Sequence, residues 1–181
     1  IVIDAQAPQN TAWHAAGTAL AFVRLCRQAI DFLTLVPNDR GMLGFSAPAD
    51  DESRHNLTRD ETLSRIAVSL AGREAERLHA EGDASINTGA ASDLEHATRL
   101  AWLAVTTWGF DTEIGELAVA ALPPQIQARL GPRLEERVSA WIEDARARVR
   151  ALLQAESHTL DTLARALLER ESLEGDEVGE I

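Results

Sequence analysis

The sequence predicts a mainly α-helical fold, a compact helical domain with one small β-hairpin. Apolar residues recur at spacings of three and four in several long segments, which is the period of an amphipathic helix. The letters TRDE at residues 58–61 form a capping box, a signal for the start of a helix. Only residues 29–48 combine β-branched and aromatic residues with turn residues, so one hairpin is predicted. With 45% apolar residues the 181-residue chain has enough material for a core, and we expect a single domain over residues 1–181.

The first predicted helix runs from a cap at Asn10 or Thr11 along an apolar stripe that includes Trp13, an expected core anchor. The two hairpin strands, "AIDFLTLVP" and "MLGFSAP", follow it and are joined by the turn residues "NDRG". The capping box then starts the second helix, in which Gly72 allows a neighbouring element to approach closely.

Three more helices are predicted in the second half of the chain. The first of them carries Trp102, also expected in the core, and ends at Gly109. The next is long and amphipathic and starts at Pro132, because proline suits the first turn of a helix. With the last helix it forms a C-terminal pair over about residues 132–170, and residues 171–181 are expected to be an acidic tail.

The composition excludes several classes of function. The 29 acidic and 17 basic residues give a net charge of -12, which opposes binding to nucleic acid or to an anionic membrane surface. The chain has no lysine, so it lacks the lysine-containing phosphate loop of ATPases, and we expect no ATPase domain in it. No apolar run approaches the ~20 residues that cross a bilayer, so we expect no direct membrane insertion. A single cysteine, Cys26, suits a reducing compartment, and we expect a cytoplasmic location, at a membrane face if the parent protein is anchored.

The segment "HAAGT" at residues 14–18 has the frame of a zinc-protease helix without its chemistry. Such a helix needs His-Glu-x-x-His, in which two imidazoles one helical turn apart hold the metal and the glutamate is the general base. Here Ala15 stands at the position of the base and Thr18 at that of the second imidazole. Only His14 keeps a side chain that binds metal.

The order of several motifs along the chain resembles the peptidase domain of the FtsH family, the membrane-anchored AAA+ zinc metalloproteases. The motifs are, in order, "TAWHAAGTAL", "LAGREAE", "NTGAASDLEHAT", "VTTWGF" and "LLERESLEGDEV". The resemblance extends from about residue 9 to residue 178 and implies the compact helical fold of that domain.

The resemblance also implies a site and an assembly. It places His14 at the first zinc ligand and Asp93 at the third, and the family motif HEAGH is replaced by HAAGT. Asp93 has a second interpretation, since a carboxylate near a helix start stabilises the helix without any metal. In the family the peptidase domains form a hexameric ring beneath an ATPase ring, so the resemblance implies a homo-oligomer, a hexamer, with an ATPase module as partner.

The first hypothesis for function is a catalytically inactive domain that serves as an oligomerisation or interaction module, as part of an AAA+ unfoldase. A threonine hydroxyl stays protonated and Ala15 has no side chain to accept a proton, so the site is expected to hold no cofactor. Thr18 is expected to hydrogen-bond His14 across the vacated position. The apolar stripe of the helix from Pro132 is the candidate surface for burial against other helices or between subunits. Loss of both motif residues favours natural degeneration over an engineered change.

Two other hypotheses use other residues. One is an ATP-dependent zinc metalloendopeptidase with an altered ligand set of His14, Asp93 and His96, since His96 lies three residues after Asp93 on the same predicted helix. The other is an adaptor for unfolded polypeptide, which would pair with a strand edge of the hairpin. The hairpin residues expected there are Leu33, Leu35, Gly41 and Gly44.

Overall fold

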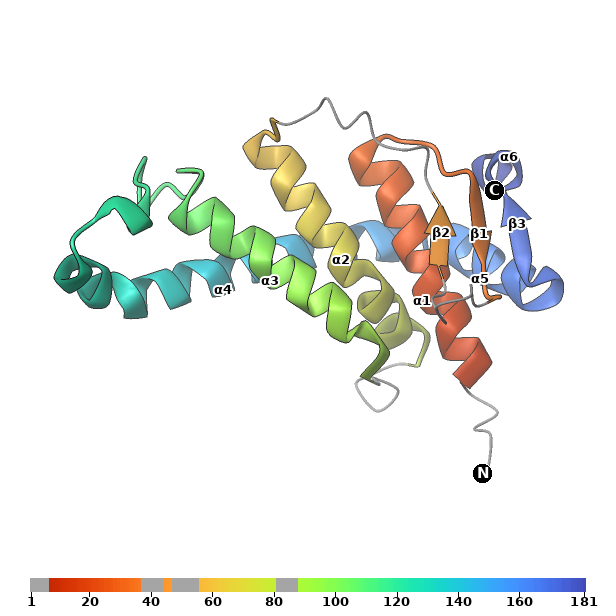
Figure 1. Ribbon diagram of the computed structural model, residues 1–181. Coiled ribbons are helices and arrows are strands. Elements are labelled where there is room, and N and C mark those ends of the chain that lie inside the picture. The colour runs from red at the N-terminus through yellow and green to blue at the C-terminus, as the bar shows by residue number, and fades with distance from the viewer. Residues whose placement is uncertain (1–6, 37–43, 47–55, 81–87) are drawn as a thin grey trace.

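Helices make up most of the chain in the computed structural model, which describes residues 7–36, 44–46, 56–80 and 88–181 (Figure 1). The α-helices are α1 (Ala7–Ala21), α2 (Arg59–His79), α3 (Ala91–Thr106), α4 (Pro124–Ala155), α5 (Ser157–Arg170) and α6 (Gly175–Glu180). Shorter helical turns are η1 (Phe22–Cys26), which is a π-helix, and the 3₁₀ turns η3 (Thr88–Ala90) and η4 (Val119–Ala121). The predicted fold class, mainly α with a small β-hairpin, is confirmed.

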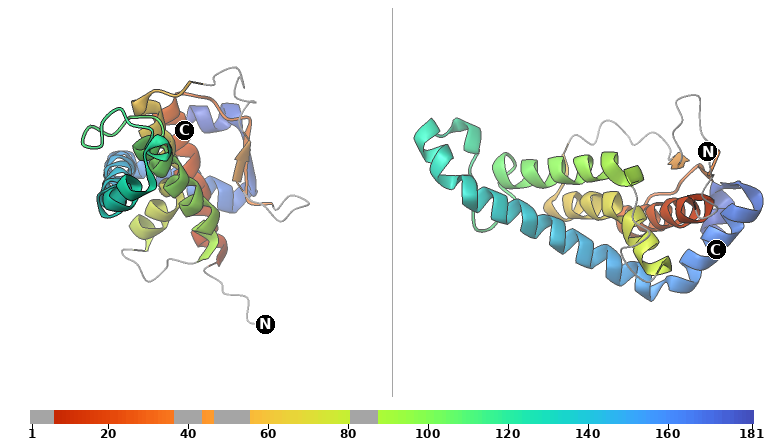
Figure 2. Two further views of the ribbon diagram at one scale, coloured as in Figure 1. Left: turned by 60° about the vertical axis from the view of Figure 1, so that its left-hand side comes forward. Right: turned by 90° about the horizontal axis from the view of Figure 1, so that it is seen from below.

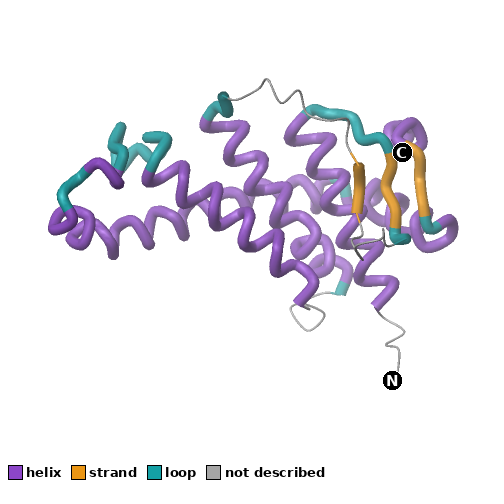
Figure 3. The backbone as a smooth tube through the Cα atoms, in the orientation of Figure 1, coloured by secondary structure: helices purple, strands orange, loops and turns teal. Residues whose placement is uncertain are grey.

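A small antiparallel sheet lies at one end of the helices (Figure 3). Its strands are β1 (Phe32–Thr34), β2 (Gly44–Ser46) and β3 (Ser172–Glu174), and β1 is central. Leu33 lies opposite Phe45 of β2 on one side and opposite Leu173 of β3 on the other. The β1–β2 pair is the predicted hairpin. The segment 171–181, predicted only as an acidic tail, contains β3 and α6, and β3 forms with the support of β1, a partner far away in the sequence.

The start of α2 follows from the capping box. The Thr58 hydroxyl accepts a hydrogen bond from the Glu61 amide at 3.2 Å, and the Glu61 carboxylate accepts one from the Thr58 amide at 2.8 Å. The helix then packs closely on α1 at two glycines. A Cβ atom on Gly17 would overlap Ala75, and one on Gly72 would overlap the ring of His14. The prediction that Gly72 allows close approach is therefore confirmed.

The long helix α4 begins at Pro124, so the predicted start at Pro132 was wrong. Both prolines suit a first helical turn, and Pro132 instead lies inside the helix, where it removes one backbone hydrogen bond. Figure 2 shows α4 running along the other helices towards the end of the molecule that carries the sheet. Its buried side chains are Leu134, Trp141, Ala145, Val149 and Leu153. Because this stripe packs on α2 and α3 of the same chain, it is not available for burial between subunits.

A buried carboxylate of α2 also forms ion pairs with α4. Glu74 of α2 is 1% exposed and accepts hydrogen bonds from Arg146 at 2.9 Å and from Arg150 at 3.0 Å, and it also pairs with Arg77. A carboxylate this deeply buried requires such partners, because an unpaired buried charge is strongly destabilising.

None of the helices in the described ranges is both long and apolar enough to cross a membrane.

The two tryptophans that were expected in the core, Trp13 and Trp102, differ in how far they are exposed to solvent. Trp13 is 6% exposed and stacks on His79 with ring centroids 3.7 Å apart, so this prediction is confirmed. Trp102 is 46% exposed, and its prediction was wrong. Ala101 fills the buried face of α3, and the next residue is turned about 100° around the helix axis, away from that face.

Candidate functional site

The imidazole of His14 lies where α1, α2 and α3 meet. Its Nδ1 atom is 2.6 Å from Oε1 of Glu76 on α2, and its Nε2 atom is 3.3 Å from Oδ2 of Asp93 on α3. The absence of a side chain on Gly72 leaves the room that the ring occupies. The structure thus brings the predicted residues His14 and Asp93 together and adds a second carboxylate. We call this group the Glu76–His14–Asp93 triad.

The charges in the triad favour a protonated ring. Both nitrogens of a histidinium are donors, and here each one faces a carboxylate. Burial lowers the pKa of His14, but the hydrogen bonds and charges of Asp93 and Glu76 outweigh this effect and raise the pKa from 6.5 to about 9. At neutral pH the triad therefore consists of a cation between two anions.

Glu76 is the residue of the site that the sequence analysis missed. Its side chain is 5% exposed, so its charge depends on a nearby partner. A signal for it was present in the segment "LAGREAE", because Glu76 lies four residues after Gly72 and therefore on the same face of α2. Gly72, which allows α1 to approach closely, therefore also indicated that the carboxylate of Glu76 would face α1.

The two altered positions of the motif carry no metal-binding chemistry. Ala15 is 4% exposed and belongs to the hydrophobic core. The Thr18 hydroxyl donates a hydrogen bond of 2.9 Å to the backbone carbonyl of His14, four residues earlier in the same helix. The predicted contact between Thr18 and His14 is therefore made with the main chain and not with the imidazole.

The residues present do not fit a zinc ion. A catalytic zinc takes three protein ligands that converge on one point, with nitrogen ligands at about 2.0–2.1 Å. In the part of the chain that the structure describes, no three histidine, cysteine, aspartate or glutamate side chains are grouped to hold a metal. Glu76 and Asp93 contact opposite nitrogens of His14 and so do not converge.

His96, the predicted substitute ligand, lies one turn after Asp93 on α3. Its pKa is lowered by burial and by the positive charges of Arg99 and Arg65, and these charges also disfavour a metal cation at that position. The ligand set of His14, Asp93 and His96 remains a hypothesis that no grouping of side chains supports.

Those hairpin residues predicted to bind polypeptide that the structure describes are divided between the central strand β1 with the residue that follows it and the edge strand β2. Leu33 is fully buried on the central strand β1, and the amide of Leu35 donates to the carbonyl of Glu171 at 2.8 Å. The main chain of β1 is thus paired on both sides, and Gly44 lies on β2, at one edge of the described sheet. Gly41 lies outside the described residues. The adaptor hypothesis remains a prediction, and β2 is the strand of the hairpin that it would use.

Comparison with known proteins matches this chain to one family. A sequence model of peptidase family M41 matches residues 1–181. The ATP-dependent zinc metalloprotease FtsH 1 of Symbiobacterium thermophilum is 41% identical over 172 residues, which are 93% of this chain and 28% of that protein. The ATP-dependent zinc metalloprotease FtsH of Thermus thermophilus is 35% identical over 187 residues, covering 98% of this chain and 29% of that protein. The chain therefore spans less than a third of the length of these relatives.

Proposed function

Because the chain belongs to peptidase family M41, we propose that it is a peptidase domain that no longer hydrolyses peptides and acts as an assembly or interaction module. The observation that carries this proposal is the Glu76–His14–Asp93 triad, in which the histidine pairs with two carboxylates. The names of its relatives describe ATP-dependent proteases, and the proposed partner is accordingly an ATPase module. We propose a cytoplasmic location, which suits a single cysteine, Cys26, that forms no disulfide.

The first support is the loss of the groups that hydrolysis needs. A metallopeptidase uses a metal to polarise the peptide carbonyl and a carboxylate to take a proton from water. Position 15 offers only a buried methyl group, and losing a general base alone lowers a rate by about 10²–10⁴. The Thr18 hydroxyl is already directed to a carbonyl of its own helix.

The second support is competition for the remaining ligands. A histidine binds metal through a neutral nitrogen, so an ion at His14 must displace the proton that Asp93 and Glu76 hold there. The ion would gain only His14 and Asp93 as ligands, because Glu76 contacts the other side of the ring. Two ligands do not complete the set that a catalytic zinc requires.

The third support is that two buried carboxylates of α2, those of Glu74 and Glu76, pair with protein side chains. Glu76 pairs with His14, and Glu74 pairs with arginines of α2 and α4. A folded domain without hydrolysis can keep contacts with copies of itself or with an ATPase module, and the outcome of ATP-driven unfolding would then be release of an intact polypeptide. We therefore propose that the domain is part of an AAA+ unfoldase.

The test compares the chain with a variant in which both altered positions are restored, Ala15→Glu with Thr18→His. Unfolded casein is the substrate, with added zinc or with a chelator, and circular dichroism checks that each protein is folded. The proposal predicts no chelator-sensitive cleavage by the original chain and static light scattering that indicates an assembly. Chelator-sensitive cleavage by the original chain would support the altered-ligand metallopeptidase instead, and a monomer at high concentration would contradict the assembly role.

A further inference from the structure

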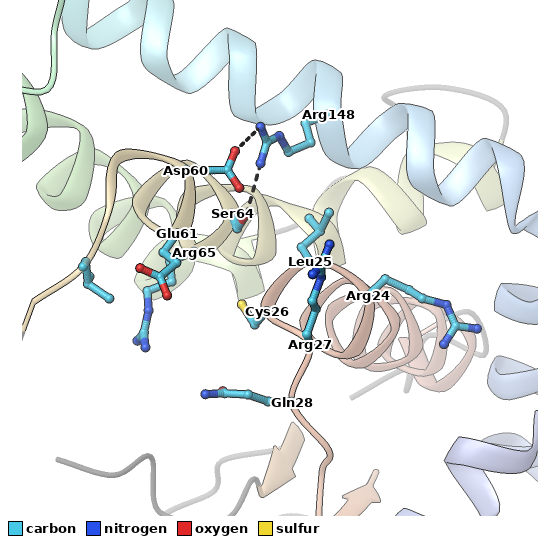
Figure 4. A pocket seen from close by; sticks show the side chains of 11 residues that line it. Arg24, Leu25, Cys26, Arg27, Gln28, Asp60, Glu61, Ser64, Arg65 and Arg148 are labelled. Atoms are coloured by element: carbon cyan, nitrogen blue, oxygen red, sulfur yellow. Dashed lines mark hydrogen bonds and ion pairs between the residues drawn. The ribbon is translucent and has the colours of Figure 1, made fainter. Parts of the chain in front are cut away.

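A cavity of about 650 Å³ lies between η1 with the residues that follow it, the first turns of α2, and Arg148 of α4 (Figure 4). None of its lining residues belongs to the Glu76–His14–Asp93 triad. The charged residues that line it are Arg24, Arg27, Arg65, Arg148, Asp60 and Glu61. In a chain with a net charge of -12, four arginines beside two carboxylates make a local excess of positive charge that favours an anion.

The arginines of the cavity differ in whether they already form hydrogen bonds or ion pairs. Arg24 forms two hydrogen bonds with the carboxylate of Glu156, at 2.9 and 3.0 Å. Arg148 donates to Asp60 at 2.7 Å and to Ser64 at 3.1 Å, as the dashed lines in Figure 4 show. Arg27, in contrast, has no hydrogen-bond or ion-pair partner among the residues that the structure describes. Its guanidinium can therefore pair with an added anion without breaking an existing ion pair.

The backbone at Arg27 is unusual as well. It follows the π-helical turn η1 and has a left-handed conformation with φ 55°. Single π-helical turns and left-handed residues other than glycine are enriched at functional sites, because both have a conformational cost. Glycine would adopt this conformation with less strain, so the arginine is present at a position where the backbone does not favour it.

A second cavity, of about 450 Å³, gives the site an apolar side. It shares Arg24, Arg27 and Gln28 with the first cavity. It then continues along residues that are mostly aliphatic or glycine, namely Val23, Ala29, Ile30, Gly175, Val178 and Gly179. The two cavities have the volumes of small-molecule sites, and among the residues that the structure describes no aromatic side chain that could stack on a nucleotide base lines either one.

We propose that this two-part cleft binds a single-chain anionic amphiphile of the medium-chain fatty carboxylate class. The carboxylate pairs with the guanidinium of Arg27, whose planar array of donors matches two carboxylate oxygens. The alkyl chain lies in the second cavity, against Val23 and Val178. This binding is independent of the proposed loss of peptidase activity.

The test is isothermal titration calorimetry of the 181-residue chain with octanoate, and with octanol as a neutral probe of the same length. Arg27→Gly removes the guanidinium and relieves the left-handed backbone, so the variant should fold, which a thermal melt checks. Gly179→Leu fills the apolar cavity, since nothing lies within 4 Å of the added Cβ atom. Arg165→Gln is the matched control, because it removes an arginine of α5 that is 69% exposed.

The proposal predicts saturable octanoate binding with one site per chain. Arg27→Gly, and replacement of octanoate by octanol, should each weaken binding by about tenfold or more, the loss expected for one charged hydrogen-bonded contact. Gly179→Leu should also weaken octanoate binding, and Arg165→Gln should leave it unchanged. Absence of saturable binding, or equal octanoate affinity in the original chain and Arg27→Gly, would overturn the proposal.

Discussion

The Nδ1 atom of His14 lies 2.6 Å from the Oε1 atom of Glu76. A histidine that binds metal usually directs its second nitrogen to such a carboxylate, which fixes the orientation of the ring. The contact of Nδ1 with Glu76 has this arrangement. The other ring nitrogen, Nε2, which would bind the metal, instead faces Oδ2 of Asp93 at 3.3 Å. The contact between His14 and Glu76 thus joins α1 to α2 by charge.

Replacing His14 by alanine should destabilise the domain by about 3 kcal/mol, because it removes the charged contact that His14 makes with the buried carboxylate of Glu76. Urea unfolding followed by circular dichroism measures this change. In the double variant His14→Ala with Glu76→Gln the loss should be smaller than the sum of the two single losses, since the residues are in contact. Strictly additive losses would show that the two residues do not interact.

The ring of His14 should titrate well above the usual range. Its pKa of about 9 lies above the unfolded value of 6.5, so the stability that its charge contributes is complete below pH 6.5 and is lost as the pH rises through 9. NMR of the ring Cε1 proton reports the pKa directly, and unfolding at pH 6, 8 and 10 reports the stability. A midpoint near 6.5, or stability that increases across this range, contradicts the triad.

The contribution of Asp111 to stability should be lost in acid, whereas that of His14 is lost in alkali. Burial raises its pKa, but hydrogen bonds from the Ile114 amide, Trp141 and Arg137 outweigh this effect, and the net pKa is lowered. A lowered carboxyl pKa contributes stability that is present above the unfolded value of 3.8 and is lost as the pH falls through the folded value.

Asp111→Asn should therefore reduce the dependence of stability on pH in acid and should cost about 2 kcal/mol at pH 7. Glu113→Gln is the control, because Glu113 is 53% exposed and also pairs with Arg137. Thermal melts between pH 3 and pH 7 make the comparison. An acid profile of Asp111→Asn that matches that of the original chain would exclude this role.

Glu74→Gln should loosen the contact between α2 and α4 and destabilise the domain by about 2–3 kcal/mol, because a buried carboxylate that pairs with Arg77, Arg146 and Arg150 loses its charge. Glu143→Gln tests the same chemistry on the surface, where the side chain is 67% exposed, and should change stability by less than about 0.5 kcal/mol. Urea unfolding of both variants measures the two changes in stability. Similar losses of stability in Glu74→Gln and Glu143→Gln would contradict the role of Glu74 in holding α4 on α2.

Features with a local signal were predictable from the sequence. The capping box at Thr58 places the start of α2, and the helical period identifies the buried faces of α2, α3 and α4. Gly72 predicted a close approach, although it did not identify the imidazole that lies there. These signals depend only on neighbouring residues, which is why they can be read from one sequence.

Features that depend on distant partners were not predictable in the same way. The strand β3 has three residues and no strong β pattern, and it forms because β1 pairs with it. Glu76 became part of the site only when α1 was packed against α2. The two prolines Pro124 and Pro132 carry the same local signal, so only the tertiary structure distinguishes the start of α4 from its interior.

We propose that a proton on His14, held between Glu76 and Asp93, takes the place of a metal ion at this site. The most direct measurement is the zinc content of the purified chain by elemental analysis, after incubation with one equivalent of zinc at pH 7 and removal of the unbound ion. We expect far less than one zinc per chain, and a higher content when Thr18→His supplies a second imidazole. One tightly held zinc per original chain, lost when His14 or Asp93 is replaced by alanine, would contradict it.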